Sequence, residues 1–151
     1  SNQRSWDFDV ESQGFRFHMS NINAAIGIEQ LKRIDFFKEK RQLIAKQYIE
    51  ILSPINEVKF LNLNYEEIVP HIFVIKVKNR DGLRDYLLKS GIECGVHYKP
   101  NHMLKMYSNP LVTLSITESL YSKIISLPCH VDLSLLEQDY VIQKIGEFYN
   151  A

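Results

Sequence analysis

The chain has 151 residues, of which 45% are hydrophobic, 11% aromatic and 24% charged. These values are typical of a soluble globular domain that is long enough to bury a core. Its 18 basic and 18 acidic side chains cancel, so charge gives no reason to expect nucleic acid or a membrane surface as a partner. Apolar runs such as HIFVIKV are far too short to span a bilayer. Two cysteines are too few for a disulfide framework, which indicates reduced thiols in a cytoplasmic protein.

Residues 1–19 mix aromatic and charged side chains without a clear period. They are typical of a strand or loop whose partners lie elsewhere, whereas a domain usually begins with an element that it can bury alone. We therefore expect the chain, 1–151, to be a single domain and a piece of a longer protein. In that domain, 1–19 would be a lead-in, 20–53 a long helix and 54–151 a small α+β region.

A long helix is predicted from an N-cap residue, a helical repeat of apolar residues and a proline that ends the repeat. Ser20 is a good N-cap, and apolar residues then recur at helical spacing as far as Leu52. Gly27 weakens a helix by about 1 kcal/mol relative to alanine, but it lets another backbone come close. Pro54 ends the pattern. We expect one helix over 20–53.

The remaining segments alternate between the two types of element. Strands are predicted near 58–61, 71–77 and 93–98, where β-branched and aromatic residues gather. Helices are predicted over 80–91, from a cap at Thr117 to just before Pro128, and from a cap at Ser134 to about residue 149. This order predicts an α+β fold, with a mostly antiparallel sheet of about three strands that has helices on one face.

One loop and the lead-in carry side chains with possible chemistry. His97, Tyr98, Lys99 and His102 follow a predicted strand and form either a solvated loop or one that faces an anion, since lysine and imidazole suit phosphate or carboxylate. A metal site needs three or four converging ligands, and the spacing of histidines and cysteines offers none. Neither cysteine has an activating neighbour in the sequence, and no phosphate-binding glycine motif is present.

The lead-in raises a similar choice. Arg16 and His18 stand just before the helix that Ser20 would cap, with no acidic residue beside them. They either face water or capture an anion near the helix N-terminus, where free N–H groups and the helix dipole favour negative charge.

Three motifs carry a resemblance to a known family. GFRFHMSNINAAIGIEQLKRID, then GVHYKPNH, then SLPCHVDLS before a final amphipathic helix, resemble the C-terminal part of the DegT/StrS family. Its members are pyridoxal-phosphate-dependent nucleotide-sugar aminotransferases of the aspartate-aminotransferase (type I) fold. The resemblance covers nearly the whole chain in the family's order, and the first motif is the most specific.

The resemblance implies roles for particular residues. In that family the lead-in reaches across a homodimer to the phosphate of the neighbouring subunit's pyridoxal phosphate, and it usually reads Gly, any, Asn, any, Arg, Met. Here Arg16 stands where Asn is expected and His18 where Arg is expected; both can donate to phosphate, although imidazole would do so in a pH-dependent way. His97 and Tyr98, with His102, would bind substrate near the sugar.

The resemblance also implies what this chain lacks. The family's Schiff-base lysine and pyridine-binding carboxylate belong to an N-terminal cofactor domain, none of whose motifs appears here. We therefore expect no catalytic residue in this chain, no cofactor bound to it in isolation and no activity of its own. The whole enzyme would transfer an amino group from an amino acid, by resemblance glutamate, to a nucleotide-linked keto-sugar in amino-sugar or surface-polysaccharide synthesis.

Two alternatives stay open at the level of sequence. The chain could be a stand-alone α+β binding or regulatory domain, dimeric through the long helix. It could also derive from a sugar dehydratase of the same family, in which a histidine replaces the lysine.

Overall fold

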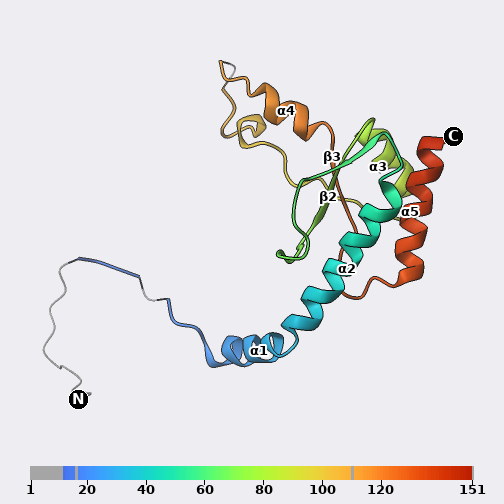
Figure 1. The fold of residues 1–151 in the computed structure, drawn as a ribbon. Coiled ribbons are helices and arrows are strands. Elements are labelled where there is room, and N and C mark those ends of the chain that lie inside the picture. Colours follow the sequence, from blue (N-terminus) through green and yellow to red (C-terminus); the bar gives the residue numbers. More distant parts are fainter. Residues whose placement is uncertain (1–11, 16, 110, 151) are drawn as a thin grey trace, which may run out of the picture. The chain divides into compact units, whose positions relative to one another are not determined.

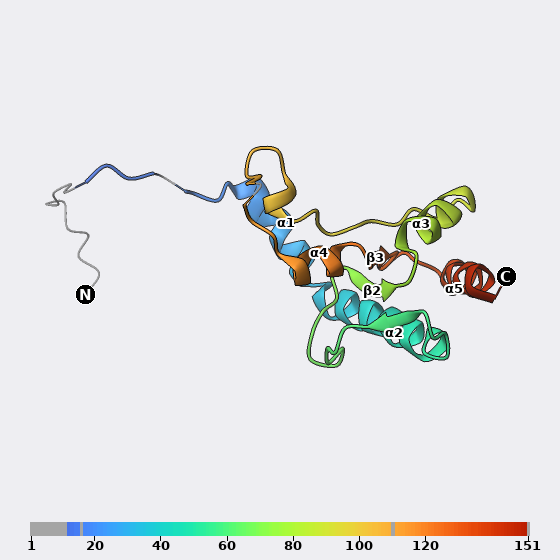
Figure 2. The same cartoon turned by 90° about the horizontal axis from the view of Figure 1, so that it is seen from above.

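A computed structural model describes residues 12–15, 17–109 and 111–150. The chain divides into two units, Ser1–Ile34 and Asp35–Ala151, and each is described by itself. Figure 1 shows the elements in chain order and Figure 2 shows them from above.

The first unit contains one described helix, α1 (Asn21–Leu31). Ser20 is its N-cap, as the sequence predicts, because the Ser20 hydroxyl accepts a hydrogen bond from the backbone N–H of Asn23 at 3.2 Å. None of the residues of α1 is buried. Its large apolar side chains, Ile22, Ile26, Ile28 and Leu31, are all more than half exposed.

The prediction of a single helix over 20–53 is wrong. A turn at Lys32 and Arg33 separates α1 from α2 (Ile34–Leu52), and there the N–H of Arg33 donates to the carbonyl of Gln30, three residues back, at 3.0 Å. Neither proline nor glycine stands at the break. Since helices in proteins are stabilised chiefly by packing of an apolar face, the absence of buried residues in α1 leaves nothing to enforce a continuous helix.

The sheet is antiparallel and three-stranded, as predicted, and its strand order is β1-β2-β3. It comprises β1 (Val58–Phe60), β2 (Phe73–Val77) and β3 (Ile124–Leu127). β2 alternates buried and half-buried residues, so one face of the sheet lies in the core.

The third strand is not the one predicted from sequence. Residues 93–98 make a single bridge, from Gly95 to Ser126, and the segment expected to continue a helix to Pro128 forms β3 instead. The preceding helix, α4 (Ser115–Tyr121), begins before Thr117, and its N-cap, Leu114, makes no side-chain cap bond. A short apolar run suits a buried strand as well as a buried helix, and all four residues of β3 are buried.

The core of the second unit lies between this sheet and the helices α2, α3 (Arg80–Lys89) and α5 (Leu135–Asn150). The Tyr48 ring of α2 stacks on Phe73 of β2, with ring centroids 5.2 Å apart. The Tyr48 hydroxyl donates to the carbonyl of Pro128 at 3.0 Å. Burial of each such side chain contributes about 1.5–3 kcal/mol.

α2 and α5 lie side by side in this core (Figure 1). The buried amide of Gln138 donates to the backbone carbonyl of Ile44 at 2.8 Å. At the surface, Gln47 donates to Asp139 at 3.1 Å. The fold class predicted from the sequence is confirmed.

Two predicted helix boundaries are confirmed by their caps. Ser134 and Glu137 form a reciprocal pair at the start of α5, where the Glu137 carboxylate accepts from the N–H of Ser134 at 2.8 Å and the Ser134 hydroxyl accepts from the N–H of Glu137 at 3.2 Å. α3 is followed by Gly91, whose φ of 78° is readily adopted only by glycine. No helix in the described part of the chain is long and apolar enough to cross a membrane.

Candidate functional site

His97 is held by two neighbours next to the isolated bridge that pairs Gly95 with Ser126 of β3. The backbone of Gly95 exchanges hydrogen bonds with Ser126, at 3.2 Å from its N–H and 2.8 Å to its carbonyl. This pairing brings the buried Ser126 hydroxyl within 2.8 Å of His97 Nδ1. The imidazole also lies over Gly95, where any Cβ would overlap the ring. A hydroxyl on one side and a bare backbone on the other therefore fix the ring's position.

Tyr98 lies beside His97 but has a different environment. Its ring meets the imidazole edge-on, with centroids 4.8 Å apart, and the peptide bond between the two residues is cis. The side chain is 76% exposed. The pair thus combines a fixed imidazole with an accessible phenol, two groups that can donate or accept hydrogen bonds.

His102 belongs to a separate pair. It lies in a short 3₁₀ turn, Asn101–Met103, and its Nε2 lies 2.9 Å from a carboxylate oxygen of Glu118 on α4. The same oxygen accepts from the backbone N–H of Leu114 at 3.0 Å. The hydrogen bond from Leu114 and then that from His102 hold the pKa of Glu118 below its usual range. His102 therefore connects the loop to α4.

The structure thus brings His97 and Tyr98 together and gives His102 a partner that the sequence did not indicate. Sequence reasoning also missed Ser126 and Gly95. The signal for Ser126 was a lone polar residue in the apolar run ahead of Pro128. Its role depends on the bridge to Gly95, which joins segments about thirty residues apart and cannot be read from local pattern.

The lead-in residues lie in the first unit. Arg16 falls outside the described residues, and His18 is exposed, two positions before the cap of α1. Phe15, Phe17 and Met19 around them are 86%, 91% and 74% exposed. The role of Arg16 and His18 in binding a cofactor phosphate stays a prediction.

The described residues contain neither a cluster of metal ligands nor an accessible cysteine. Among them, no group of three or more His, Cys, Asp or Glu side chains gathers to hold a metal ion. Both cysteines are buried, and burial raises the pKa of Cys94 to about 12 and also raises that of Cys129. Neither thiol is suited to act as a nucleophile, which requires a thiolate.

The chain resembles several known proteins over most of its length. It is 29% identical over 147 residues to the UDP-4-amino-4,6-dideoxy-N-acetyl-beta-L-altrosamine transaminase of Campylobacter jejuni, covering 92% of this chain and 39% of that protein. The chain thus spans about two fifths of the length of this curated relative.

Solved structures show the same relationship. A DegT/DnrJ/EryC1/StrS aminotransferase from Brucella abortus matches 94% of this chain and 40% of its own, with 32% identity and a TM-score of 0.79. NtdA from Bacillus subtilis, solved with bound cofactor PMP, matches 98% of this chain and 36% of its own, with 27% identity and a TM-score of 0.87. The sequence pattern of one family matches residues 1–146. The chain belongs to the DegT/DnrJ/EryC1/StrS aminotransferase family.

Proposed function

We propose that this chain is the C-terminal part of a pyridoxal-phosphate-dependent aminotransferase, which moves an amino group from an amino acid, glutamate by resemblance, to a nucleotide-linked keto-sugar. The family match over residues 1–146 carries the proposal, and the Campylobacter jejuni relative supports the substrate class.

The side chains of the chain suit one part of a cofactor site. When bound, pyridoxal phosphate supplies the electron sink that amino-group transfer requires. Arg16 and His18 offer a guanidinium and an imidazole, which are both suitable donors to its phosphate. A Schiff-base lysine is usually activated by desolvation, whereas every lysine of this chain lies in the described part and none is buried. Arg16 and His18 therefore fit the phosphate of the cofactor. Because no lysine of this chain is buried, we assign the Schiff-base lysine to an N-terminal cofactor domain.

On the substrate side, we propose that His97 and Tyr98 line the sugar site. The fixed imidazole would hydrogen-bond the sugar, since Ser126 and Gly95 set its orientation. The exposed Tyr98 ring would pack against the sugar or donate its hydroxyl. His102 would contribute at the border of the site while its bond to Glu118 holds the loop to α4.

We further propose that the enzyme is a cytoplasmic homodimer. Exposed apolar side chains of the lead-in and α1, including Phe15, Phe17 and Ile22, support a subunit interface, because patches of this kind usually mark association sites. Gly27 faces open space in this chain, which leaves room there for a second backbone.

The full-length enzyme provides the test. The enzyme purified with pyridoxal phosphate should convert the cofactor to its amino form when glutamate is added. Addition of the keto-sugar should restore the original form of the cofactor. Both conversions are measured by the change in absorbance. The proposal would be contradicted if glutamate failed to convert the cofactor and no nucleotide keto-sugar tried reacted with the amino form.

Two variants of that enzyme test the cofactor contacts. Arg16→Ala should weaken pyridoxal-phosphate binding about tenfold or more, the value of one charge-assisted hydrogen bond, and His18→Ala should do so more mildly. Lys105→Ala, in an exposed loop, is the control. Wild-type cofactor affinity in Arg16→Ala would end the hypothesis for that residue.

A further inference from the structure

A basic groove lies on the second unit, between the sheet and α4. Its volume is about 850 Å³, which is the size of a small-molecule site. It is lined from β1, β2, the start of α3, α4 and the turn that follows α4. Its cations are Lys59, Lys76, Lys78, Arg80 and Lys123. None of His97, Tyr98 and His102 lines it.

The positive charge of this groove is local. The chain as a whole has equal numbers of basic and acidic residues, yet the groove sets five cations against two carboxylates, Glu57 and Asp81. Asp81 is already engaged, because its carboxylate pairs with the buried Arg80 at 2.6 Å. Arg80 also donates to the carbonyls of Tyr121 and Ile124, at 3.0 and 3.2 Å, so its role is to fix the groove's wall.

The lysines of the two strands have no ion-pair partner in the described part of the chain. Lys59 of β1 and Lys76 of β2 stand directly opposite one another in the antiparallel register, on the face away from the buried Val58 and Val77. Like charges in this arrangement destabilise a sheet. Neither lysine, nor Lys78, forms an ion pair with any described residue, and Lys76 is half-buried. An anion between them would remove the repulsion.

The lining also defines the chemistry of that anion. No aromatic side chain lines the groove in the described part of the chain, so a nucleobase has nothing to stack on. Serine hydroxyls of α4 and the following turn, Ser119 and Ser122, add small polar groups. The surplus of three positive charges exceeds the roughly two negative charges that one phosphate group carries at pH 7.

We propose that this groove binds the diphosphate group of a small anionic ligand, with Lys59 and Lys76 as its main contacts. The proposal does not depend on the enzyme activity proposed above, because it uses only the residues and register of the second unit. The same chemistry is present in free pyrophosphate and in a nucleoside diphosphate, and the two are compared as separate probes.

Titration calorimetry of the 151-residue chain at low salt is the experiment. Inorganic pyrophosphate should bind saturably and more tightly than orthophosphate. Lys59→Gln and Lys76→Gln should each weaken this binding about tenfold, the value of a charge-assisted hydrogen bond. Lys89→Gln, which removes an exposed charge at the far end of α3, is the matched control and should change it less than about twofold.

Two further arms secure the interpretation. Lys76→Arg keeps the charge and should therefore keep the binding. This variant separates loss of binding through loss of charge from loss through misfolding. Far-ultraviolet circular dichroism checks that each variant is folded. Uridine diphosphate should bind with the same affinity as pyrophosphate, because only the diphosphate is recognised. Clearly tighter binding of uridine diphosphate would show that the nucleoside is also bound and would contradict the recognition of the diphosphate alone. Absence of saturable binding at millimolar pyrophosphate, or equal weakening by Lys89→Gln, would overturn the proposal.

Discussion

At the scale of single residues, Ser126 has a position that explains the geometry around His97. It is 4% exposed, its backbone pairs with Gly95 and its hydroxyl reaches the imidazole. A buried hydroxyl that fixes a neighbouring ring contributes both stability and orientation. The imidazole would remain near β3 without it, but with more freedom to rotate.

The first prediction concerns this contact. Ser126→Ala should lower the free energy of unfolding by about 1 kcal/mol, the net value of a typical hydrogen bond, as measured by urea denaturation. The imidazole resonances of His97 should also shift and broaden in NMR spectra. Ser108→Ala removes only an exposed hydrogen bond, to the carbonyl of Lys105. It is the control, and should lower the free energy of unfolding less and leave the His97 resonances unchanged. An unchanged His97 spectrum in Ser126→Ala would show that the hydroxyl does not hold the ring.

Gly95 offers an independent check of the same geometry. A methyl group at this position would overlap the His97 ring, so Gly95→Ala should displace the ring even with Ser126 intact. Wild-type imidazole resonances in this variant would contradict the packing described here.

The second prediction concerns the two thiols. Burial raises the pKa of Cys94 to about 12, and that of Cys129 is raised as well, so very little thiolate is present at pH 8. Both should react with Ellman's reagent only as fast as the core opens, and rapidly once the chain is unfolded in guanidinium. Cys94→Ala and Cys129→Ala separate the two signals. Immediate reaction of either thiol in the native chain would be inconsistent with its burial.

At the scale of elements, α3 and α5 are joined by a polar cluster at the edge of the core. The Glu147 carboxylate of α5 accepts hydrogen bonds from Tyr86 of α3 at 2.9 Å, from Lys144 at 2.7 Å and from Gln143 at 2.8 Å. Lys144, then Gln143 and Tyr86, lower the pKa of Glu147 to about 2. The carboxylate is therefore more stable in the ionised form in the folded chain than in the unfolded chain.

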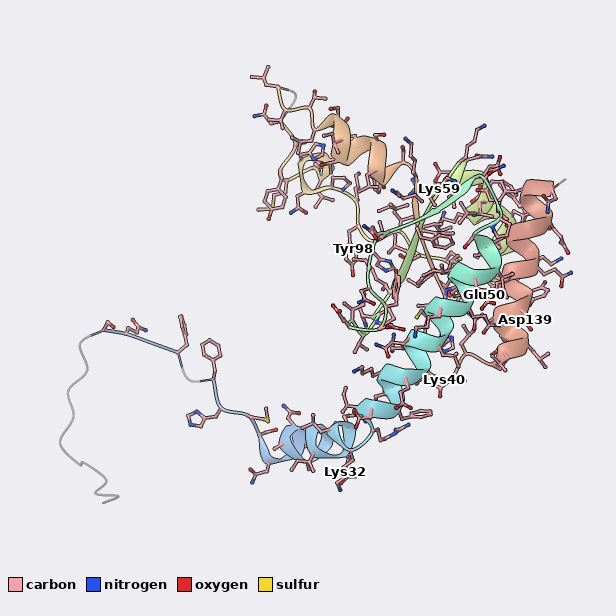
Figure 3. All side chains as sticks on the ribbon, in the orientation of Figure 1. Lys32, Lys40, Glu50, Lys59, Tyr98 and Asp139 are labelled. Atoms are coloured by element: carbon pink, nitrogen blue, oxygen red, sulfur yellow. The ribbon has the colours of Figure 1, made fainter. Side chains whose placement is uncertain are left out.

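The third prediction follows from this pKa. A carboxyl group with a lowered folded-state pKa stabilises the fold above its unfolded pKa of about 4.5, and that stabilisation is lost as the pH falls towards 2. Glu147→Gln should therefore melt at a lower temperature than the wild type at pH 7, and the difference should shrink between pH 5 and pH 2. Glu50→Gln, on the exposed side of α2 (Figure 3), is the control. A difference that does not vary with pH would refute the assigned role.

At the scale of the whole molecule, the two units differ in how much they bury. The second unit has a core drawn from α2, α3, α5 and the sheet. In α1 of the first unit, by contrast, no residue is buried. An apolar helix of this kind normally packs against another surface.

The fourth prediction concerns that surface. The 151-residue chain on its own should self-associate in sedimentation experiments, because Phe15, Phe17, Ile22 and Ile26 are left exposed. Replacing Ile22 and Ile26 by serine should reduce the association. Replacement of Ile116, which is equally apolar and exposed on α4, should reduce it less. A chain that stays monomeric at high concentration would count against the proposed interface.

The same chain should show no transamination with glutamate and a nucleotide keto-sugar, since none of its lysines is buried. After addition of pyridoxal phosphate and borohydride, mass spectrometry should find no single lysine stoichiometrically modified. Modification of one lysine would contradict the assignment of the Schiff-base lysine to another part of the enzyme.

The sequence alone determined the features that depend on near neighbours. The caps at Ser20 and Ser134 and the stop at Gly91 were readable because each acts within one turn of helix. The strand over Phe73–Val77 was readable from its β-branched and aromatic residues. The family was readable from motifs that keep their spacing, whereas the substrate-binding role of His97 and Tyr98 stays a prediction.

Tertiary structure decided the features whose energy comes from distant partners. Residues 124–127 form a strand because β2 pairs with them, although their apolar run suits a helix equally well. Residues 93–98 have strand composition but gain only one bridge. The helix over 20–53 is interrupted at Lys32 and Arg33, where no local breaker stands, because packing supports α2 and not α1. The partner of His97 was likewise set by a backbone pairing across about thirty residues, which no local pattern encodes.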